Sequence, residues 1–364
     1  MFPKYNYLLR LSNGMVFRCY SNTYNSNYYG RIVFSTSNSG YIESITDPSY
    51  CNQILVFSSL NIGNCGFTYS DFESHRIWLS AIVVNKITTY YSNYRSDGNI
   101  SRLLKRYKVI VLETDNTRDI VYEIRSRSIK YAYIYSIKKI NAPFKKREIV
   151  NISISTKIPY CYFYNRFNNY KVCSKVLVLD FGLKNNMFIS LGLIGLFPLI
   201  ESTSSFMFSF TTIKPNGILL SSGPGNANTF TSLISKVSKL ISISKIPILG
   251  ICLGHQIISL CLNMCLLEMK YGHHGVNHPI KFLNCKKLLI STQNHNFCIT
   301  NRYCNTNIFY SLFDKSIQGF LFKKDLIITI QGHPESSPGV KDLRFVFGNF
   351  KEMILLCQKK KYWL

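Results

Sequence analysis

The sequence predicts an α/β protein with two domains: a smaller mixed β/α domain, then a domain built on a central, mostly parallel sheet flanked by helices. The chain has 364 residues, more than the roughly 200–250 at which one core stops growing. It is 46% hydrophobic and 17% charged, which is typical of globular proteins. Strand-like and helical runs alternate only in the second half. We expect domains at residues 1–145 and 173–364, joined by a linker at 146–172.

The first domain is predicted from short β-rich runs separated by turn residues. YLLRLSNGMVFRCYS, residues 7–21, reads as a hairpin around Ser12-Asn13-Gly14. Further strand-like runs occupy residues 31–37, 52–59 and 77–84, and a basic amphipathic stretch precedes the strand-like VIVLET. Periodicity alone gives this domain no function.

The second domain is predicted from a repeated strand–helix pattern. KVLVLDFG and NGILLSSGPG read as strands ending in glycine, each followed by a helical run, and PILGICLGHQIISLCL reads as strand, tight turn and helix. A parallel sheet places its site at the carboxyl ends of its strands.

Composition excludes several classes of protein. No apolar run reaches the ~20 residues of a membrane-spanning helix, and the start has neither a secretory signal nor a transit peptide. The net charge of +25 raises the alternative of nucleic-acid binding. Its basic residues are dispersed and no nucleic-acid-binding motif accompanies them, so we expect no nucleic-acid or membrane partner.

The twelve cysteines show no regular spacing and no C-x-x-C pair, which argues against disulfides and thiol-ligated zinc. His273, His274 and His278 raise the alternative of a metal site. Because no cysteine or carboxylate stands at ligand spacing, we expect no metal.

Cys252 is the candidate nucleophile. An apolar strand delivers it into a turn between Gly250 and Gly254, and a helix follows, as in a nucleophile elbow. A helix N-terminus stabilises a thiolate, and the Leu253 N–H points toward an oxyanion. The alternative is an ordinary buried cysteine.

Two further motifs follow predicted strand ends. His333 and Glu335, in QGHPESS, supply a base and a carboxylate to orient it, and alternation in an extended segment would place both on one side. SSGPGN, residues 221–226, exposes backbone amides able to approach an oxyanion. Taken in isolation, the alternative for QGHPESS is a surface loop, and SSGPGN is better read as an ordinary tight turn.

Together, in this order, the three motifs resemble the class I, triad-type glutamine amidotransferases. YGHHGVNHP (271–279), STQNHNFCI (291–299) and SLFDKSIQGF (311–320) resemble the carbamoyl-phosphate synthase small subunit in particular. So do the N-terminal segments 34–50, 61–66 and 92–120, in a domain that other class I enzymes lack. In the resembled family, the 271–279 segment is a structural loop near the active site.

The resemblance implies a glutaminase that forms a thioester on Cys252, with His333 as base and acid and Glu335 as its orienter. It implies L-glutamine contacts from a set of eight residues: Ser49, Gly223, Gly225, Leu253, Gln256, Asn294, Asn296 and Phe297. Ammonia would pass to a large synthetase subunit that uses ATP and Mg²⁺, for arginine and pyrimidine synthesis. This chain itself is expected to carry no cofactor.

Three departures from the family pattern bear on glutamine affinity: Asn296 replaces a glycine, and Ser222 and Asn226 replace an Asn and an Asp. A catalytically weak scaffold for the large subunit is the alternative. An AT-biased composition and a separate small subunit favour a plastid-encoded protein of the chloroplast stroma, with a bacterial cytoplasm as the alternative.

Overall fold

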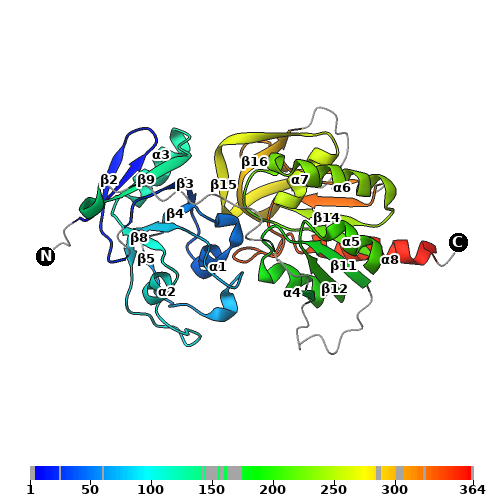
Figure 1. Ribbon diagram of the computed structural model, residues 1–364, viewed down its shortest axis with the longest axis horizontal. Coiled ribbons are helices and arrows are strands. Elements are labelled where there is room, and N and C mark those ends of the chain that lie inside the picture. The colour runs from blue at the N-terminus through cyan, green and yellow to red at the C-terminus, as the bar shows by residue number, and fades with distance from the viewer. Residues whose placement is uncertain are drawn as a thin grey trace. The chain divides into compact units, whose positions relative to one another are not determined.

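The computed structural model describes residues 5–23, 26–59, 61–140, 143, 155, 160–161, 174–283, 288–300, 307–322 and 325–361. Its contacts divide the chain into two compact units (Figure 1). The first is Met1–Ile149 with Lys270–Gly275, and the second is Val150–Met269 with Val276–Leu364. The expected α/β class is confirmed. Apart from residues 155 and 160–161, the predicted linker lies outside the described residues.

The first unit contains a mixed seven-stranded sheet in the order β2-β1-β9-β3-β4-β6-β8. Its strands are β1 Tyr7–Leu11, β2 Val16–Cys19, β3 Tyr28–Ser35, β4 Ile54–Phe57, β6 Ala81–Val84, β8 Ile110–Glu113 and β9 Tyr131–Ser136. A second, two-stranded sheet pairs β5 Asn61–Ile62 with β7 Lys86–Ile87. The helices are α1 Tyr41–Thr46, α2 Ile100–Arg106 and α3 Thr117–Ser126, with 3₁₀ turns at Pro48–Tyr50, Tyr69–Asp71 and Ile137–Lys139.

Alternation along β4 explains how this sheet is buried on both faces. Ile54 and Val56 join one apolar cluster, whereas Leu55 and Phe57 join another. Successive side chains of a strand point to opposite faces, so a continuous apolar run needs cover on both sides. The predicted hairpin is also confirmed, since β1 and β2 pair antiparallel and Gly14 takes φ +94 in their turn.

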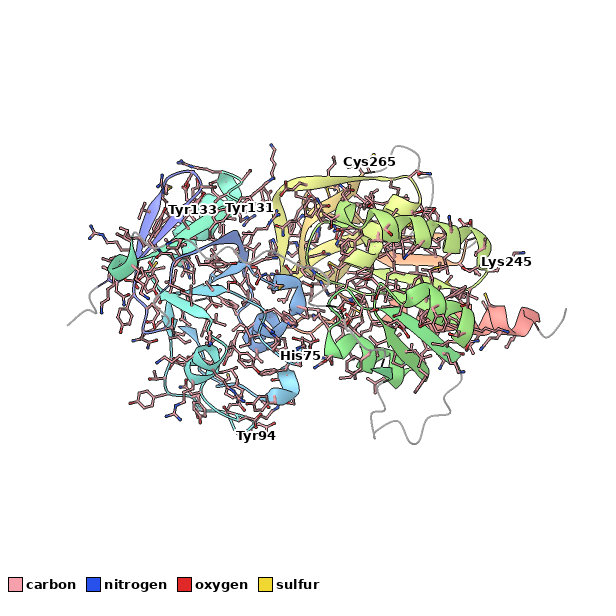
Figure 2. The ribbon with its side chains drawn as sticks, in the orientation of Figure 1. His75, Tyr94, Tyr131, Tyr133, Lys245 and Cys265 are labelled. Atoms are coloured by element: carbon pink, nitrogen blue, oxygen red, sulfur yellow. The ribbon has the colours of Figure 1, made fainter. Side chains whose placement is uncertain are left out.

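Tyrosines line one stretch of β9, where residues two apart share a face. The Tyr29 ring lies 5.6 Å from that of Tyr131 and 4.6 Å from that of Tyr133. Figure 2 labels the two β9 tyrosines side by side.

The second unit contains a ten-stranded sheet in the order β10-β12-β11-β13-β14-β19-β18-β16-β15-β17. Its strands are β10 Tyr160–Cys161, β11 Ser174–Leu179, β12 Leu196–Glu201, β13 Gly217–Leu220, β14 Ile248–Ile251, β15 Cys265–Phe282, β16 Leu288–Thr300, β17 Asn307–Ser311, β18 Ile317–Phe322 and β19 Ile327–Ile330. Its helices are α4 Asn185–Leu193, α5 Phe206–Ile213, α6 Thr231–Ile243, α7 Leu253–Cys261 and α8 Phe345–Lys361, with a 3₁₀ turn at Ala227–Thr229.

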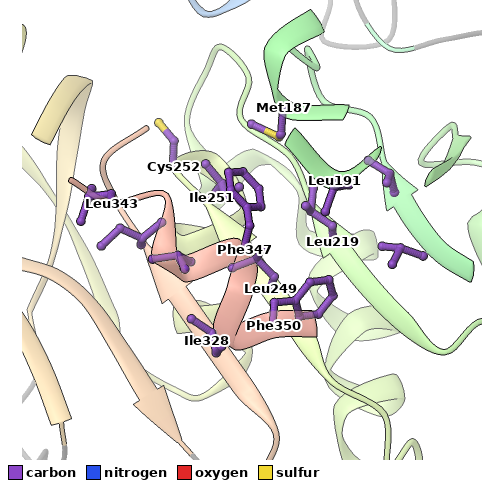
Figure 3. Close-up of a cluster of buried hydrophobic side chains, with 14 of the residues drawn as sticks. Met187, Leu191, Leu219, Leu249, Ile251, Cys252, Ile328, Leu343, Phe347 and Phe350 are labelled. Atoms are coloured by element: carbon purple, nitrogen blue, oxygen red, sulfur yellow. The ribbon is translucent and has the colours of Figure 1, made fainter. Parts of the chain in front are cut away.

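The parallel part of this sheet comprises β12, β11, β13, β14 and β19, and antiparallel strands extend it from β18 onward. Side chains of α4 and α8 cover one face, in an apolar cluster that includes Cys252 at its margin (Figure 3). Side chains of α5, α6 and α7 cover the other. The 271–279 segment, expected as a loop, lies instead within the long strand β15. No helix in the described part of the chain is long and apolar enough to cross a membrane.

Candidate active site

Cys252 stands in a strained turn between strand β14 and helix α7. Its backbone takes φ +52 and ψ −102. This conformation is unfavourable in free energy for any residue other than glycine, and such strained residues cluster at functional sites. The Cys252 N–H donates to the Ile330 carbonyl at 2.9 Å, and the Gly254 N–H donates to the Ser221 carbonyl at 3.1 Å. These bonds hold the expected elbow between the ends of β13 and β19.

The two glycines of the elbow are required by close backbone contacts. A Cβ at Gly250 would lie 2.8 Å from the Gly254 carbonyl oxygen, and one at Gly254 would lie 2.2 Å from the Leu220 carbonyl oxygen. Both distances are far below van der Waals contact, so no other residue fits without moving backbone.

The glycine turn after β13 approaches the elbow with free backbone donors. Gly223 is buried, and a Cβ there would lie 2.4 Å from the Phe181 carbonyl oxygen, while Gly225 takes φ +106. Within the described residues, the N–H groups of Gly223 and Leu253 have no hydrogen-bond acceptor. Such unpaired donors beside a nucleophile are suited to binding an oxyanion.

His333 and Glu335 follow strand β19, whose end lies beside that of β14, with Ile330 opposite Ile251. His333 Nδ1 lies 2.7 Å from Glu335 Oε1, and both side chains are buried. The expected juxtaposition is present, but the expected extended segment is wrong. The chain turns here, because the Ser336 N–H donates back to the His333 carbonyl at 3.1 Å. The turn brings the His333 and Glu335 side chains to the same side, as the alternation of side chains in an extended segment would also have done.

The charges of this pair depend on each other. Burial lowers the pKa of His333, but the Glu335 carboxylate and the Cys252 sulfur raise it well above its ordinary value. Burial raises the pKa of Glu335, and Lys184 and His333 together lower it to about 2. The site therefore holds an imidazolium and a carboxylate near neutral pH.

Lys184, immediately before α4, is a site residue that sequence reasoning missed. Its side chain is 1% exposed, and its Nζ lies 3.0 Å from Glu335 Oε1 and also donates to the Ser337 carbonyl. Its only sequence signal was its place two residues after the Asp-Phe-Gly segment (180–182) that follows β11, at the same sheet edge as the other motifs.

Gln331 was also missed, although it stands two residues before His333. It is fully buried and its Nε2 lies 3.6 Å from Cys252 Sγ. A buried glutamine directly after an apolar strand was the available signal, since a buried amide needs partners.

Of the candidate glutamine contacts, Asn294 touches the nucleophile and Gln256 touches Phe297. The Asn294 carbonyl accepts from Cys252 Sγ at 3.8 Å, and the Phe297 carbonyl accepts from Gln256 Nε2 at 3.3 Å. Asn296 lies between them on β16 and is half-buried. Ser49 belongs to the first unit, where its N–H donates to Asp47 Oδ1 at 2.8 Å, and its expected role stays a prediction.

No cluster of three or more potential metal ligands occurs in the described ranges. Two of the three histidines considered as ligands pack against aromatic rings. The His274 ring lies 5.5 Å from that of Phe34, and the His278 ring lies 5.1 Å from that of Phe313.

Two families match the sequence. Residues 9–134 match the CPSase domain of the carbamoyl-phosphate synthase small chain, and residues 177–353 match glutamine amidotransferase class I.

Three bacterial proteins named carbamoyl phosphate synthase small chain are similar over most of their length. The one from Buchnera aphidicola subsp. Baizongia pistaciae is 35% identical over 97% of this chain and 94% of its own. Those from Wigglesworthia glossinidia brevipalpis and Helicobacter hepaticus are 34% and 32% identical, covering 89% and 95% of this chain and 90% and 97% of their own. These bacterial relatives give the plastid expectation no support. The chain belongs to the carbamoyl-phosphate synthase small-chain family.

Proposed function

We propose that this chain is the glutaminase subunit of a carbamoyl-phosphate synthase and hydrolyses L-glutamine at Cys252. The observation that carries the proposal is the buried Cys252–His333–Glu335 set at the ends of two adjacent parallel strands. A nucleophile, a base and a group that orients the base are the parts required for thiol-based amide hydrolysis.

In the proposed reaction, Cys252 Sγ attacks the carboxamide carbon of glutamine while His333 holds the thiol proton. The oxyanion accepts hydrogen bonds from the N–H groups of Gly223 and Leu253. His333 gives its proton to the departing nitrogen, which leaves as ammonia, and a γ-glutamyl thioester remains. Water then attacks the thioester with His333 as base, and this releases glutamate and restores the thiol.

Around Cys252, the residues Gly225, Gln256, Asn294, Asn296 and Phe297 would contact the amino-acid end of glutamine. Ser49 is kept as a candidate glutamine contact on the family resemblance alone. An unmatched buried polar group costs about 1–3 kcal/mol, so such contacts would separate glutamine from other amides. The Asn296 side chain would weaken affinity more than chemistry.

Ammonia would pass to a separate large subunit that uses ATP, Mg²⁺ and bicarbonate, and its product would serve arginine and pyrimidine synthesis. No cofactor is proposed for this chain. Its compartment, a bacterial cytoplasm or a plastid stroma, remains a prediction, and the bacterial relatives favour the first.

The test is glutamate release from glutamine by the wild type and by Cys252→Ser, each with and without a cognate large subunit. We expect release that requires Cys252 and rises with the partner. Equal, negligible release by both proteins with the partner bound would overturn the proposal in favour of a scaffold role.

A further inference from the structure

Two buried glutamines connect strand β16 to the Cys252 sulfur. Gln256 Nε2 lies 3.3 Å from the Phe297 carbonyl oxygen and 3.1 Å from Gln331 Oε1. Gln331 Nε2 in turn lies 3.6 Å from Cys252 Sγ. Gln256 is 3% exposed and Gln331 is fully buried. Gln256 comes from α7, Gln331 from the end of β19 and Cys252 from the elbow, and these three residues form one chain of hydrogen bonds.

The direction of this chain is fixed at one end. A backbone carbonyl only accepts hydrogen bonds, so Gln256 must present its NH₂ group to Phe297. That same NH₂ group faces Gln331, which must therefore present its oxygen. The other half of the Gln331 amide, its NH₂ group, is left facing the sulfur. Gln331 is thus oriented as a donor to Cys252.

The sulfur has a different partner for each of its protonation states. As a thiol it donates to the Asn294 carbonyl oxygen, 3.8 Å away. As a thiolate it has no proton to donate and only accepts, and Gln331 Nε2 is a neutral donor within reach. A hydrogen bond to the charged form of a group favours that form.

We propose that Gln331 stabilises the Cys252 thiolate and that Gln256, a candidate contact for glutamine, sets the orientation of Gln331. The inference deepens the proposed function and rests on it for its role in catalysis. It joins binding of the substrate's amino-acid end to activation of the nucleophile. If glutamine binding changes the contacts of Gln256, the orientation of Gln331 changes with it, and so does the hydrogen bond from Gln331 to the Cys252 sulfur.

Other ionisable groups around the sulfur must be held constant in the test. His333 faces it directly, with Glu335 and Lys184 behind. His255 on α7 and His295 on β16 are turned to other partners, the Thr329 hydroxyl and the Phe297 carbonyl. Because all of these remain in a variant at position 331, the difference between two proteins isolates Gln331.

The experiment measures the rate at which iodoacetamide alkylates Cys252 in the full-length chain as a function of pH. Mass spectrometry of the Cys252 peptide separates this thiol from the other cysteines. Gln331→Met keeps the side-chain length but removes the hydrogen-bond donor. In this variant we expect the midpoint of the curve of alkylation rate against pH to rise by about one pH unit. That rise corresponds to roughly a tenfold slower alkylation below the midpoint.

Gln318→Met is the matched control. Gln318 is an equally buried glutamine on β18, and its Nε2 donates to Ser316 Oγ at 3.0 Å rather than to the sulfur. We expect its midpoint to equal that of the wild type. Gln331→Glu is a second variant, in case Gln331→Met does not fold. It keeps an oxygen toward Gln256 but places a carboxylate oxygen at the sulfur, so its midpoint should rise further.

Glutamine hydrolysis measured on the same samples distinguishes the two proposals. Unchanged midpoints in folded Gln331→Met and Gln331→Glu, with a wild type that hydrolyses glutamine, would overturn the inference and leave the proposed function intact. Raised midpoints in a chain that hydrolyses no glutamine with its large subunit would support the inference and overturn the function.

Discussion

Lys184 Nζ lies 3.0 Å from Glu335 Oε1, and the two side chains are 1% and 0% exposed. The same carboxylate oxygen lies 2.7 Å from His333 Nδ1. One buried anion thus lies between two cationic groups. A buried charge is tolerated only when it is paired, so Lys184 and His333 together keep Glu335 ionised.

Lys184→Met should destabilise the fold by about 3 kcal/mol, the lower end of the cost of removing one partner from a buried ion pair, because His333 still faces the carboxylate. Denaturant unfolding measures this. Lys245→Met, which removes an exposed lysine, is the control and should change stability by less than about 0.5 kcal/mol. The double variant Lys184→Met/Glu335→Gln should lose less than the sum of the single losses. Additive losses would contradict the pairing.

Glu335→Gln should reduce kcat for glutamine hydrolysis by roughly 10²–10⁴, since the base loses the group that orients it. It should also move the alkaline limb of the kcat/KM profile to lower pH. Burial lowers the pKa of His333, and Glu335 is the strongest of the groups that raise it again. Without that charge the imidazolium loses its proton at a lower pH. An alkaline limb that stays in place would show that Glu335 does not control the His333 charge.

Gly254→Ala should destabilise the fold by about 2 kcal/mol or more, because its Cβ would lie 2.2 Å from the Leu220 carbonyl oxygen. The matched control is Gly348→Ala on helix α8, where a Cβ meets nothing within 4 Å. Alanine there should stabilise the fold by about 0.5–1 kcal/mol. Thermal unfolding of both variants provides the measurement. A Gly254→Ala protein as stable as wild type would mean that the elbow is looser than described.

His255 should make the fold sensitive to acid. Burial lowers the pKa of this side chain from 6.5 to about 3, so between these values the unfolded chain binds a proton that the folded chain does not. Stability is therefore lost as pH falls from about 6.5 toward 3. His255→Asn, which preserves a group for the Thr329 hydroxyl, removes this loss.

The measurement is the free energy of unfolding of wild type and His255→Asn against pH. The difference between the two curves should approach a slope of about 1.4 kcal/mol per pH unit below pH 6. Parallel curves would show that His255 is not the source of the acid sensitivity.

The fold class, the hairpin of the first unit and the strand–helix order of the second could all be predicted from the sequence. These features follow from local patterns, because the spacing of apolar residues along a segment indicates whether it is a strand or a helix and which face it buries. Gly250, Cys252 and Gly254 were identified in the same way, since the tight turn demands glycine at fixed offsets. The His-x-Glu motif showed which two side chains meet, but not that a turn rather than an extended strand joins them.

The buried polar residues that surround the nucleophile could not be predicted from the sequence, because they come together only in the folded chain. Lys184, Gln331 and Cys252 lie in separate segments of the chain, and no local pattern relates their side chains. Their contacts depend on the order of β11, β13, β14 and β19 in the sheet, which brings the carboxyl ends of these strands to one edge. A buried charge or amide must find its partner across such an edge, and the identity of that partner is fixed by strand order and register rather than by spacing.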